Sequence, residues 1–174
     1  TFKNALLIVD TTPFEVPQPI NLLKKFSLWS EHYKIYCYKY LFLVNRENGL
    51  ICYCSNAHNG NEHDLQIYKN ENINELLPSN TLVIGDRIFY SLYDEICKKI
   101  IIGYRNPKNE FEKKFNYYLS QERVIIENVF KRIKSYRVLF EQKFTFRDKR
   151  KHEILLKGFL NIINIDLIIH PIRK

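Results

Sequence analysis

The sequence predicts a single α/β domain in which three antiparallel strands are followed by alternating helices and strands. Two observations lead to this fold class. Short apolar runs of strand length end at turn residues in the first half of the chain, and apolar residues recur at helical spacing in the second half. The chain has 174 residues, of which 45% are hydrophobic, so it can bury one substantial core. We therefore expect residues 1–174 to form one domain.

The first expected element is a buried strand over residues 4–9, an apolar run whose end is β-branched. This strand would present Asp10 at its C-terminal tip. Three prolines follow, Pro13, Pro17 and Pro19, and each removes a hydrogen-bond donor and fixes φ. Residues 11–19 are therefore predicted to be an extended loop.

A β-hairpin comes next, because the aromatic and apolar residues 34–44 and 50–55 flank a turn at residues 45–49. Residues 64–77 have roughly helical apolar spacing, although their Asn-rich middle disfavours a continuous helix. Another short buried strand, residues 81–85, ends at Asp86. Two predicted strands thus end in an aspartate.

The remaining elements are a short helix over residues 91–97, a strand over residues 99–103 and two longer helices. The first of these has Ser120 as its N-cap, and the last covers residues 154–169 after a charged run at residues 147–152. This order of elements is that of an RNase H-like fold. It predicts a mixed five-stranded sheet flanked by helices.

The charge balance favours a polyanionic partner. There are 27 Lys and Arg residues against 19 Asp and Glu, a formal net charge of +8, and nucleic acid is the leading candidate. No apolar run approaches the ~20 residues of a membrane span, and the first residues do not resemble a signal peptide, so no membrane partner is expected. Because Met is absent even at position 1, we expect a region before Thr1 that this chain lacks, including any N-terminal DNA-binding region.

The sequence disfavours several other kinds of site. The four cysteines form no CxxC pair and the five histidines no HxxxH pattern, so a zinc site is not expected and reduced cysteines are. No GxxxxGK loop is present, which excludes a nucleotide hydrolase of the P-loop type.

Three acidic residues form the candidate catalytic group. Neighbouring strand ends would place Asp10 and Asp86 side by side, and Glu127, on a helix packed against the sheet, would complete the cluster. Close carboxylates repel one another unless a cation neutralises them, and carboxylate oxygens suit Mg²⁺ or Mn²⁺. Two such ions could activate an attacking oxygen and stabilise a leaving oxygen. Taken singly, each acid has an ordinary alternative as a turn residue or a helical ion-pair partner. His63 and Asp64 either support the metal site from behind or act as a loop and helix cap.

Four ordered blocks carry a family resemblance. They are residues 9–13 (Val-Asp-Thr-Thr-Pro), residues 60–64 (Gly-Asn-Glu-His-Asp), residues 85–90 (Gly-Asp-Arg-Ile-Phe-Tyr) and the segment 115–134 with its Phe-Asn, Leu-Ser, Arg, Glu and Phe positions. Together they resemble the DDE superfamily endonucleases of the PIF/Harbinger type and the related insertion-sequence transposases. The chain departs from the family pattern at three places. Thr11 stands where the family has Gly or Cys, Ile88 and Phe89 stand where it has a Gly, and Lys131 stands where a Gly follows the Phe.

The resemblance implies a metal-dependent enzyme that cuts DNA phosphodiesters and joins 3′-hydroxyl ends to target DNA. Asp10, Asp86 and Glu127 would be its ligands for two divalent ions, and Arg123 would orient the helix or contact phosphate. It further implies a Myb-like DNA-binding partner protein and a location in the nucleus, or in the cytoplasm of a bacterial host, and a homodimer is an additional expectation. Basic residues would track DNA phosphates beside the acidic centre, unless they form only a solvated face: Lys131, Arg132, Lys134, Arg137, Arg147, Lys149, Arg150 and Lys151.

Two alternatives stay open at this point. A domesticated descendant of a transposase would keep the fold and the basic surface as a DNA- or protein-binding module without cutting. A nuclease acting on RNA or RNA–DNA hybrids is the other, and the sequence has no specific sign of it.

Overall fold

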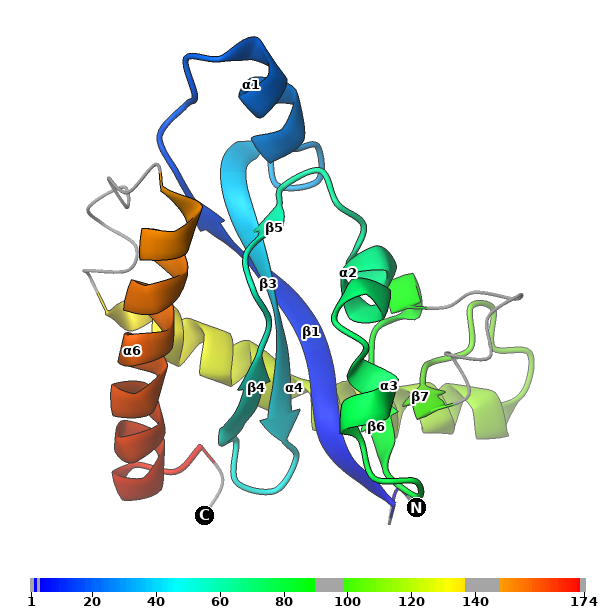
Figure 1. Cartoon of the computed structure of the whole chain (residues 1–174). Helices are drawn as coiled ribbons and strands as arrows, with labels where there is room; N and C mark the ends of the chain where they lie inside the picture. The colour runs from blue at the N-terminus through cyan, green and yellow to red at the C-terminus, as the bar shows by residue number, and fades with distance from the viewer. Residues whose placement is uncertain (1, 3, 90–98, 137–147, 173–174) are drawn as a thin grey trace.

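The computed structural model describes residues 2, 4–89, 99–136 and 148–172. A central twisted sheet has helices on both faces (Figure 1). The principal helices are α2 (Asp64–Asn70), α3 (Ile73–Leu76), α4 (Glu110–Ser135) and α6 (Lys149–Ile169), with a short α1 (Leu22–Leu28) and a 3₁₀ turn, η1 (Arg87–Phe89). No helix in these ranges is both long enough and apolar enough to cross a membrane.

The sheet confirms the predicted fold class. β1 (Ala5–Glu15) pairs antiparallel with β3 (Ile35–Asn45), which pairs antiparallel with β4 (Ile51–Cys54). On its other side β1 pairs parallel with β6 (Leu82–Ile84), and β6 pairs parallel with β7 (Ile100–Ile101). The strands β4-β3-β1-β6-β7 form a mixed five-stranded core of the RNase H-like kind within a seven-stranded sheet. Two-residue strands, β2 (Trp29–Ser30) and β5 (His58–Asn59), add to β3.

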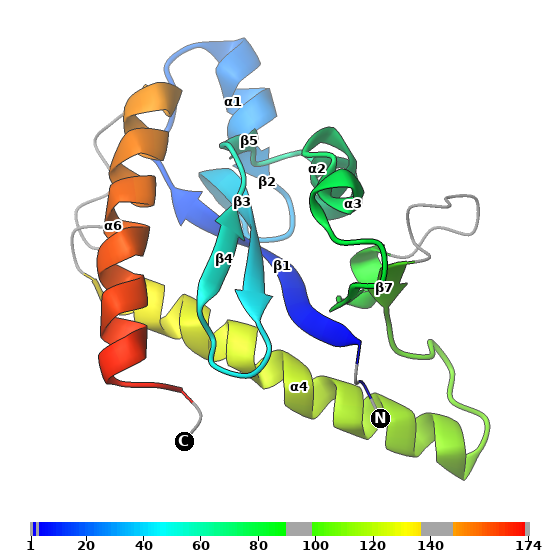
Figure 2. The same cartoon turned by 60° about the horizontal axis from the view of Figure 1, so that its bottom comes forward.

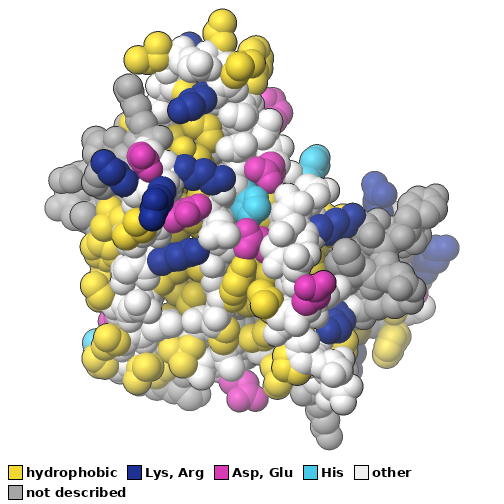
Figure 3. Space-filling model, viewed as in Figure 1, with side chains coloured by type: hydrophobic (Ala, Val, Ile, Leu, Met, Phe, Trp, Pro, Cys, Tyr) yellow, Lys and Arg dark blue, Asp and Glu magenta, His cyan; other side chains and the backbone are white. Residues whose placement is uncertain are grey.

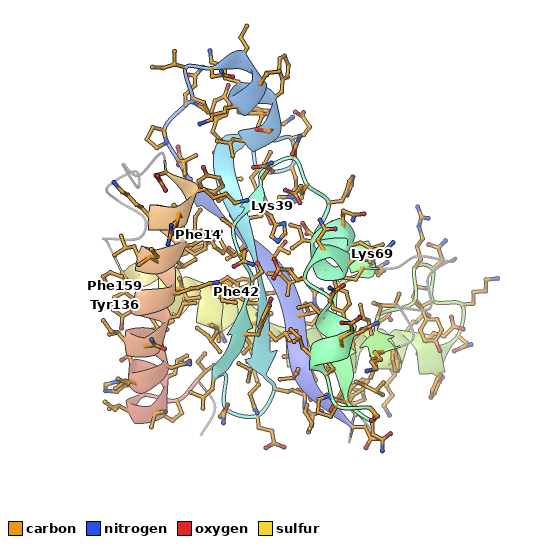
Figure 4. All side chains as sticks on the ribbon, in the orientation of Figure 1. Phe14, Lys39, Phe42, Lys69, Tyr136 and Phe159 are labelled. Atoms are coloured by element: carbon orange, nitrogen blue, oxygen red, sulfur yellow. The ribbon has the colours of Figure 1, made fainter. Side chains whose placement is uncertain are left out.

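The core has two halves, one on each face of the sheet. Alternate residues of β1 point to opposite faces, so Ile8 packs in one half and Val9 in the other. The first half lies under α4 and α6, where Ile126 and Leu156 are buried, and the second lies under α2 and α3 (Figure 2). At the end of α4 the ring of Tyr136 packs edge-to-face on that of Phe159, with 6.5 Å between the ring centroids. This contact links α4 to α6 (Figure 4).

The first strand extends further than predicted. β1 does not end before Asp10 but continues to Glu15, so the prediction of a loop from residue 11 was wrong for Thr11 to Glu15. Among the described residues, β1 beyond Ile8 pairs with β3 alone, and Pro13 lies opposite Lys39 in that pairing. A proline is tolerated there because one side of the strand has no ladder to break.

The helices begin at other residues than predicted, because side chains that cap their N-termini set where each helix starts. α4 begins at Glu110, where the Asn109 side chain accepts a hydrogen bond from the Glu112 N–H, and Ser120 is not an N-cap but lies within the helix. α6 likewise begins at Lys149, after the cap Asp148, and so includes part of the charged run. The segment 64–77 is broken at Asn72, which has the left-handed φ of 48°. The predicted helix over residues 91–97 lies outside the described residues.

Gly60, in the connection from β5 to α2, is required by close packing. A Cβ added there would lie 2.2 Å from the Leu28 carbonyl oxygen and 3.0 Å from that of Cys37. Both obstacles are backbone, so we expect Gly60→Ala to lower the free energy of unfolding by about 1–3 kcal/mol. Chemical denaturation measures this. Asn61→Ala, at the exposed neighbouring position, should change it by no more than about 0.5 kcal/mol. Equal effects of the two substitutions would contradict the packing argument.

Candidate active site

Asp10 and Asp86 lie on neighbouring strands. Asp10 is in β1, just beyond the stretch that pairs with β6, and Asp86 follows the end of β6 by two residues. Both side chains line a cleft of about 570 Å³, together with Lys39, His63 and Asp64. The fold therefore brings together carboxylates that are distant in the sequence.

One guanidinium group faces both carboxylates. Arg123 of α4 donates from Nη2 to Oδ2 of Asp86 at 3.1 Å, and the same nitrogen lies 3.9 Å from Oδ2 of Asp10. The other carboxylate oxygens accept backbone hydrogen bonds, Asp10 Oδ1 from the Thr11 N–H and Asp86 Oδ1 from the Arg87 N–H. Arg123 thus contacts the acidic pair directly, instead of acting only on the helix or on phosphate.

The environment of Asp10 disfavours its bare anion. Burial, with smaller contributions from the charges of Asp64 and Asp86, raises the pKa of Asp10 to about 6, although the Thr11 N–H and Arg123 act in the opposite direction. A cation bound at this carboxylate would offset the cost of burying its negative charge and the repulsion by the neighbouring carboxylates. The donor set, two neighbouring carboxylates, is of the hard oxygen type that Mg²⁺ or Mn²⁺ prefers.

Asp64 is the third carboxylate of the cleft, and its partner is Lys39. The Lys39 ammonium lies 3.2 Å from Asp64 Oδ1 and donates a second hydrogen bond to the Glu62 carbonyl. The exposed fractions of the two side chains are only 9% and 10%. Figure 4 shows Lys39 on β3 beside the segment that leads into α2. His63 is exposed at the N-cap of α2 and makes no capping bond with its side chain, so the prediction of a cap holds for its backbone position only.

A second polar group, centred on His58, holds both ends of α2. His58 bonds through Nε2 to Glu71 at 2.6 Å and through Nδ1 to Glu62 at 3.0 Å. Tyr53 of β4 donates to the same Glu71. These contacts tie β4 and β5 to the residues that bracket α2, and so they hold Asp64 in place against the sheet.

Sequence reasoning missed two members of the cleft. Lys39 is a lone cation within the aromatic and apolar β3, and that isolation was a signal of a buried partner. Tyr33 also lines the cleft, and burial together with the charges of Asp64 and Asp10 raises its pKa to about 12. Residues 30–34 resemble part of the middle block of the family, but Tyr33 was not expected in the site, because the turn between β2 and β3 sets its position.

Glu127 is exposed on α4, one turn after Arg123. In the part of the chain that the structure describes, no group of three or more His, Cys, Asp or Glu side chains is close enough to hold a metal ion. Glu127 as the third ligand therefore stays a prediction.

The predicted DNA-binding residues fall in separate places. Burial lowers the pKa of Lys134 of α4, and the negative charge of Asp10 partly offsets this lowering. Arg132 instead pairs with Asp166 of α6 at 2.5 Å. Lys131 is exposed on α4, Arg137 and Arg147 lie outside the described residues, and an exposed group begins α6: Lys149, Arg150 and Lys151.

Comparison with known proteins gives one finding. The family model described as DDE superfamily endonuclease matches residues 9–165, nearly the whole chain, and the match includes every acid of the cleft. No curated protein and no solved structure matches significantly.

Proposed function

Because the chain belongs to the DDE superfamily endonucleases, we propose that it is a divalent-metal-dependent transposase domain that cuts DNA and joins the freed 3′-hydroxyl to target DNA. The observation that supports this most is the placement of Asp10 and Asp86 around the single cationic group of Arg123. A nuclease of this kind has DNA as its substrate. The Harbinger subtype, a Myb-like partner and a nuclear location stay predictions.

Asp10 and Asp86 would hold the metal ions, with Glu127 as the proposed third ligand. Mg²⁺ or Mn²⁺ bound there would activate the attacking oxygen and stabilise the leaving oxygen of the phosphodiester. Arg123 holds the two carboxylates together and offsets their mutual repulsion. Lys134, further along α4, adds a positive charge within electrostatic range of Asp10 that would attract the DNA backbone toward the acidic cleft.

The proposal is tested by nicking of supercoiled plasmid with Mg²⁺ or Mn²⁺ and with a chelator. We expect nicking only with the metal. Calorimetry on the same samples measures whether the metal binds. Metal-independent DNA binding without nicking would reject the enzyme and leave the domesticated binding module as the function.

Glu127 is tested in the same assay. Loss of one metal ligand should slow a reaction that depends on charge stabilisation by several kcal/mol, so we expect Glu127→Gln to reduce the nicking rate by at least about 100-fold. Glu75→Gln, at an exposed acid on α3, serves as the matched control and should nick at the wild-type rate. If Glu127→Gln also keeps that rate, Glu127 is not a ligand and the third carboxylate must be sought elsewhere, with Asp64 the first candidate.

A further inference from the structure

The acidic cleft has one wall that is built from aromatic rings. We name the four residues that form it, and that line the same cleft as Asp10 and Asp86, the aromatic wall: Phe26 of α1, Trp29 of β2, and His32 and Tyr33 of the turn before β3. The side chain of Phe26 is 75% exposed, and Figure 3 shows apolar side chains over α1 at the top of the molecule. Packing in the core therefore does not account for the ring of Phe26.

The other three rings of the aromatic wall are held in place by their neighbours. Trp29 and Tyr36 are cross-strand partners in β2 and β3, and their ring centroids lie 5.1 Å apart. The indole N–H of Trp29 donates to the Glu31 carboxylate at 2.8 Å. The rings of His32 and Tyr33 pack edge-to-face, with 4.6 Å between their centroids. A ligand that binds rings fixed in this way orders few further side chains, which lowers the cost of binding.

The charges of the cleft would keep a DNA strand out. Among the described residues that line it are one lysine, Lys39, which is already paired with Asp64, and five carboxylates. The carboxylates belong to Asp10, Glu31, Glu62, Asp64 and Asp86. Even with Arg123 beside Asp10 and Asp86, these acids outnumber the cations and repel a phosphodiester. A strand held here therefore needs an attraction that does not depend on charge.

Aromatic rings supply such an attraction to an unpaired base. Every nucleobase has a flat π-face, and stacking on an aromatic side chain strengthens binding by about 5- to 150-fold per base. A base inside a duplex is already stacked between its neighbours and must leave the helix to reach a side wall. The cleft, of about 570 Å³, lies within the range of roughly 300–1,000 Å³ that is typical of small-ligand sites. It therefore has room for one base with its sugar.

We propose that the aromatic wall stacks an unpaired base of the DNA strand whose phosphodiester lies at Asp10 and Asp86. The proposal rests on the proposed function for the identity of the ligand as DNA. It goes further by naming the state of that DNA, which is single-stranded or frayed beside the cleavage point and not intact duplex. The aromatic wall is close enough to the acidic pair for this, because the charge of Asp10 acts on the Tyr33 hydroxyl.

The fluorescence of Trp29 tests the proposal without nuclease activity. Trp29 is the only tryptophan among the 174 residues, so its emission reports on the aromatic wall. The protein is titrated in chelator and about 0.1 M salt with a thymidine oligonucleotide about ten nucleotides long. A strand of equal length that lacks its bases and a fully paired duplex are the comparisons, and the anisotropy of an end label measures binding. We expect the thymidine strand alone to quench Trp29, and to bind at least about fivefold more tightly than the abasic strand.

Phe26→Ala identifies the aromatic wall as the binding surface. Loss of one stacking ring should weaken binding of the thymidine strand at least about fivefold and leave the affinity for the abasic strand unchanged. Leu23→Ala is the matched control, because Leu23 is an 80% exposed apolar residue of the same helix, and its replacement should leave both affinities unchanged.

Four outcomes would overturn the proposal: a thymidine strand that does not bind, one that binds without quenching Trp29, an abasic strand that quenches equally, or equal effects of the two alanine substitutions. Failure of the proposed function is distinguishable from these. Quenching without metal-dependent nicking would reject the nuclease and keep the aromatic wall, whereas nicking without quenching would reject the aromatic wall alone.

Discussion

Replacing Asp10 with asparagine should abolish metal-dependent nicking and, at the same time, make the metal-free protein more stable. Nicking is lost because an amide neither neutralises nor holds a divalent ion as a carboxylate does. Since such an ion supplies several kcal/mol of charge stabilisation, we expect a loss of at least about 1,000-fold. Stability rises because the anion of Asp10 is unfavourable where it lies, as its pKa of about 6 indicates.

The pH dependence of the second effect follows from the direction of the pKa shift. The folded-state pKa of Asp10 lies above the ordinary aspartate value of 3.8, so between these two pH values the folded state binds more protons than the unfolded state. The contribution of Asp10 to stability therefore decreases as the pH rises from about 4 to about 6, and it stays low above that. At neutral pH the asparagine variant should be more stable by about 2–3 kcal/mol. At pH 4 the difference should nearly vanish.

Chemical denaturation in the presence of a chelator at pH 4, 5, 6 and 7 measures this difference. Glu47→Gln, in the exposed turn between β3 and β4, is the control and should show no comparable trend. The two effects of the Asp10 substitution are separable. A variant that loses nicking but gains no stability would contradict the account of burial at Asp10, and a variant that gains stability but still nicks would remove Asp10 from the catalytic group.

The sequence predicted the frame of this fold because its strands have local signals. The hairpin of β3 and β4 and the short β6 are continuous apolar runs that end at turn residues. The local sequence of such runs is sufficient to predict that they form strands. The extent of β1 could not be read locally. Pro13 indicates a loop, but the pairing of residues 7–15 with β3 decides the outcome, and that pairing is a long-range interaction.

Only the part of the candidate site that lies at the ends of neighbouring strands could be predicted from the sequence. Asp10 and Asp86 were expected to be adjacent because their strands are neighbours, and Arg123 does reach both. The Lys39–Asp64 contact joins a strand to a helix 25 residues later, and nothing in the spacing indicates it. The direction in which Glu127 points depends on how α4 is rotated over the sheet, and an amphipathic pattern defines that rotation only approximately.

Removing the positive charge of Lys39 should be the most destabilising single substitution in the cleft. Lys39→Met keeps an unbranched apolar stem of nearly the same length but leaves Asp64 buried without its cation, near Asp10. Breaking a buried ion pair from one side typically costs about 3–5 kcal/mol, because one charge remains uncompensated. Total stability is commonly only about 5–15 kcal/mol, so the variant should unfold at a much lower denaturant concentration.

The matched control is Lys34→Met, because Lys34 pairs with Glu31 at the surface, where the side chains are 65% and 77% exposed. Water screens that pair, so its loss should change the free energy of unfolding by less than about 1 kcal/mol. The double variant Lys39→Met with Asp64→Leu tests the cause. It removes both charges and should recover most of the loss, because the cost lies in the uncompensated carboxylate and not in the missing contact. If the double variant is as unstable as Lys39→Met alone, Lys39 stabilises the fold through its hydrogen bond to the Glu62 carbonyl, and the ion pair with Asp64 contributes little.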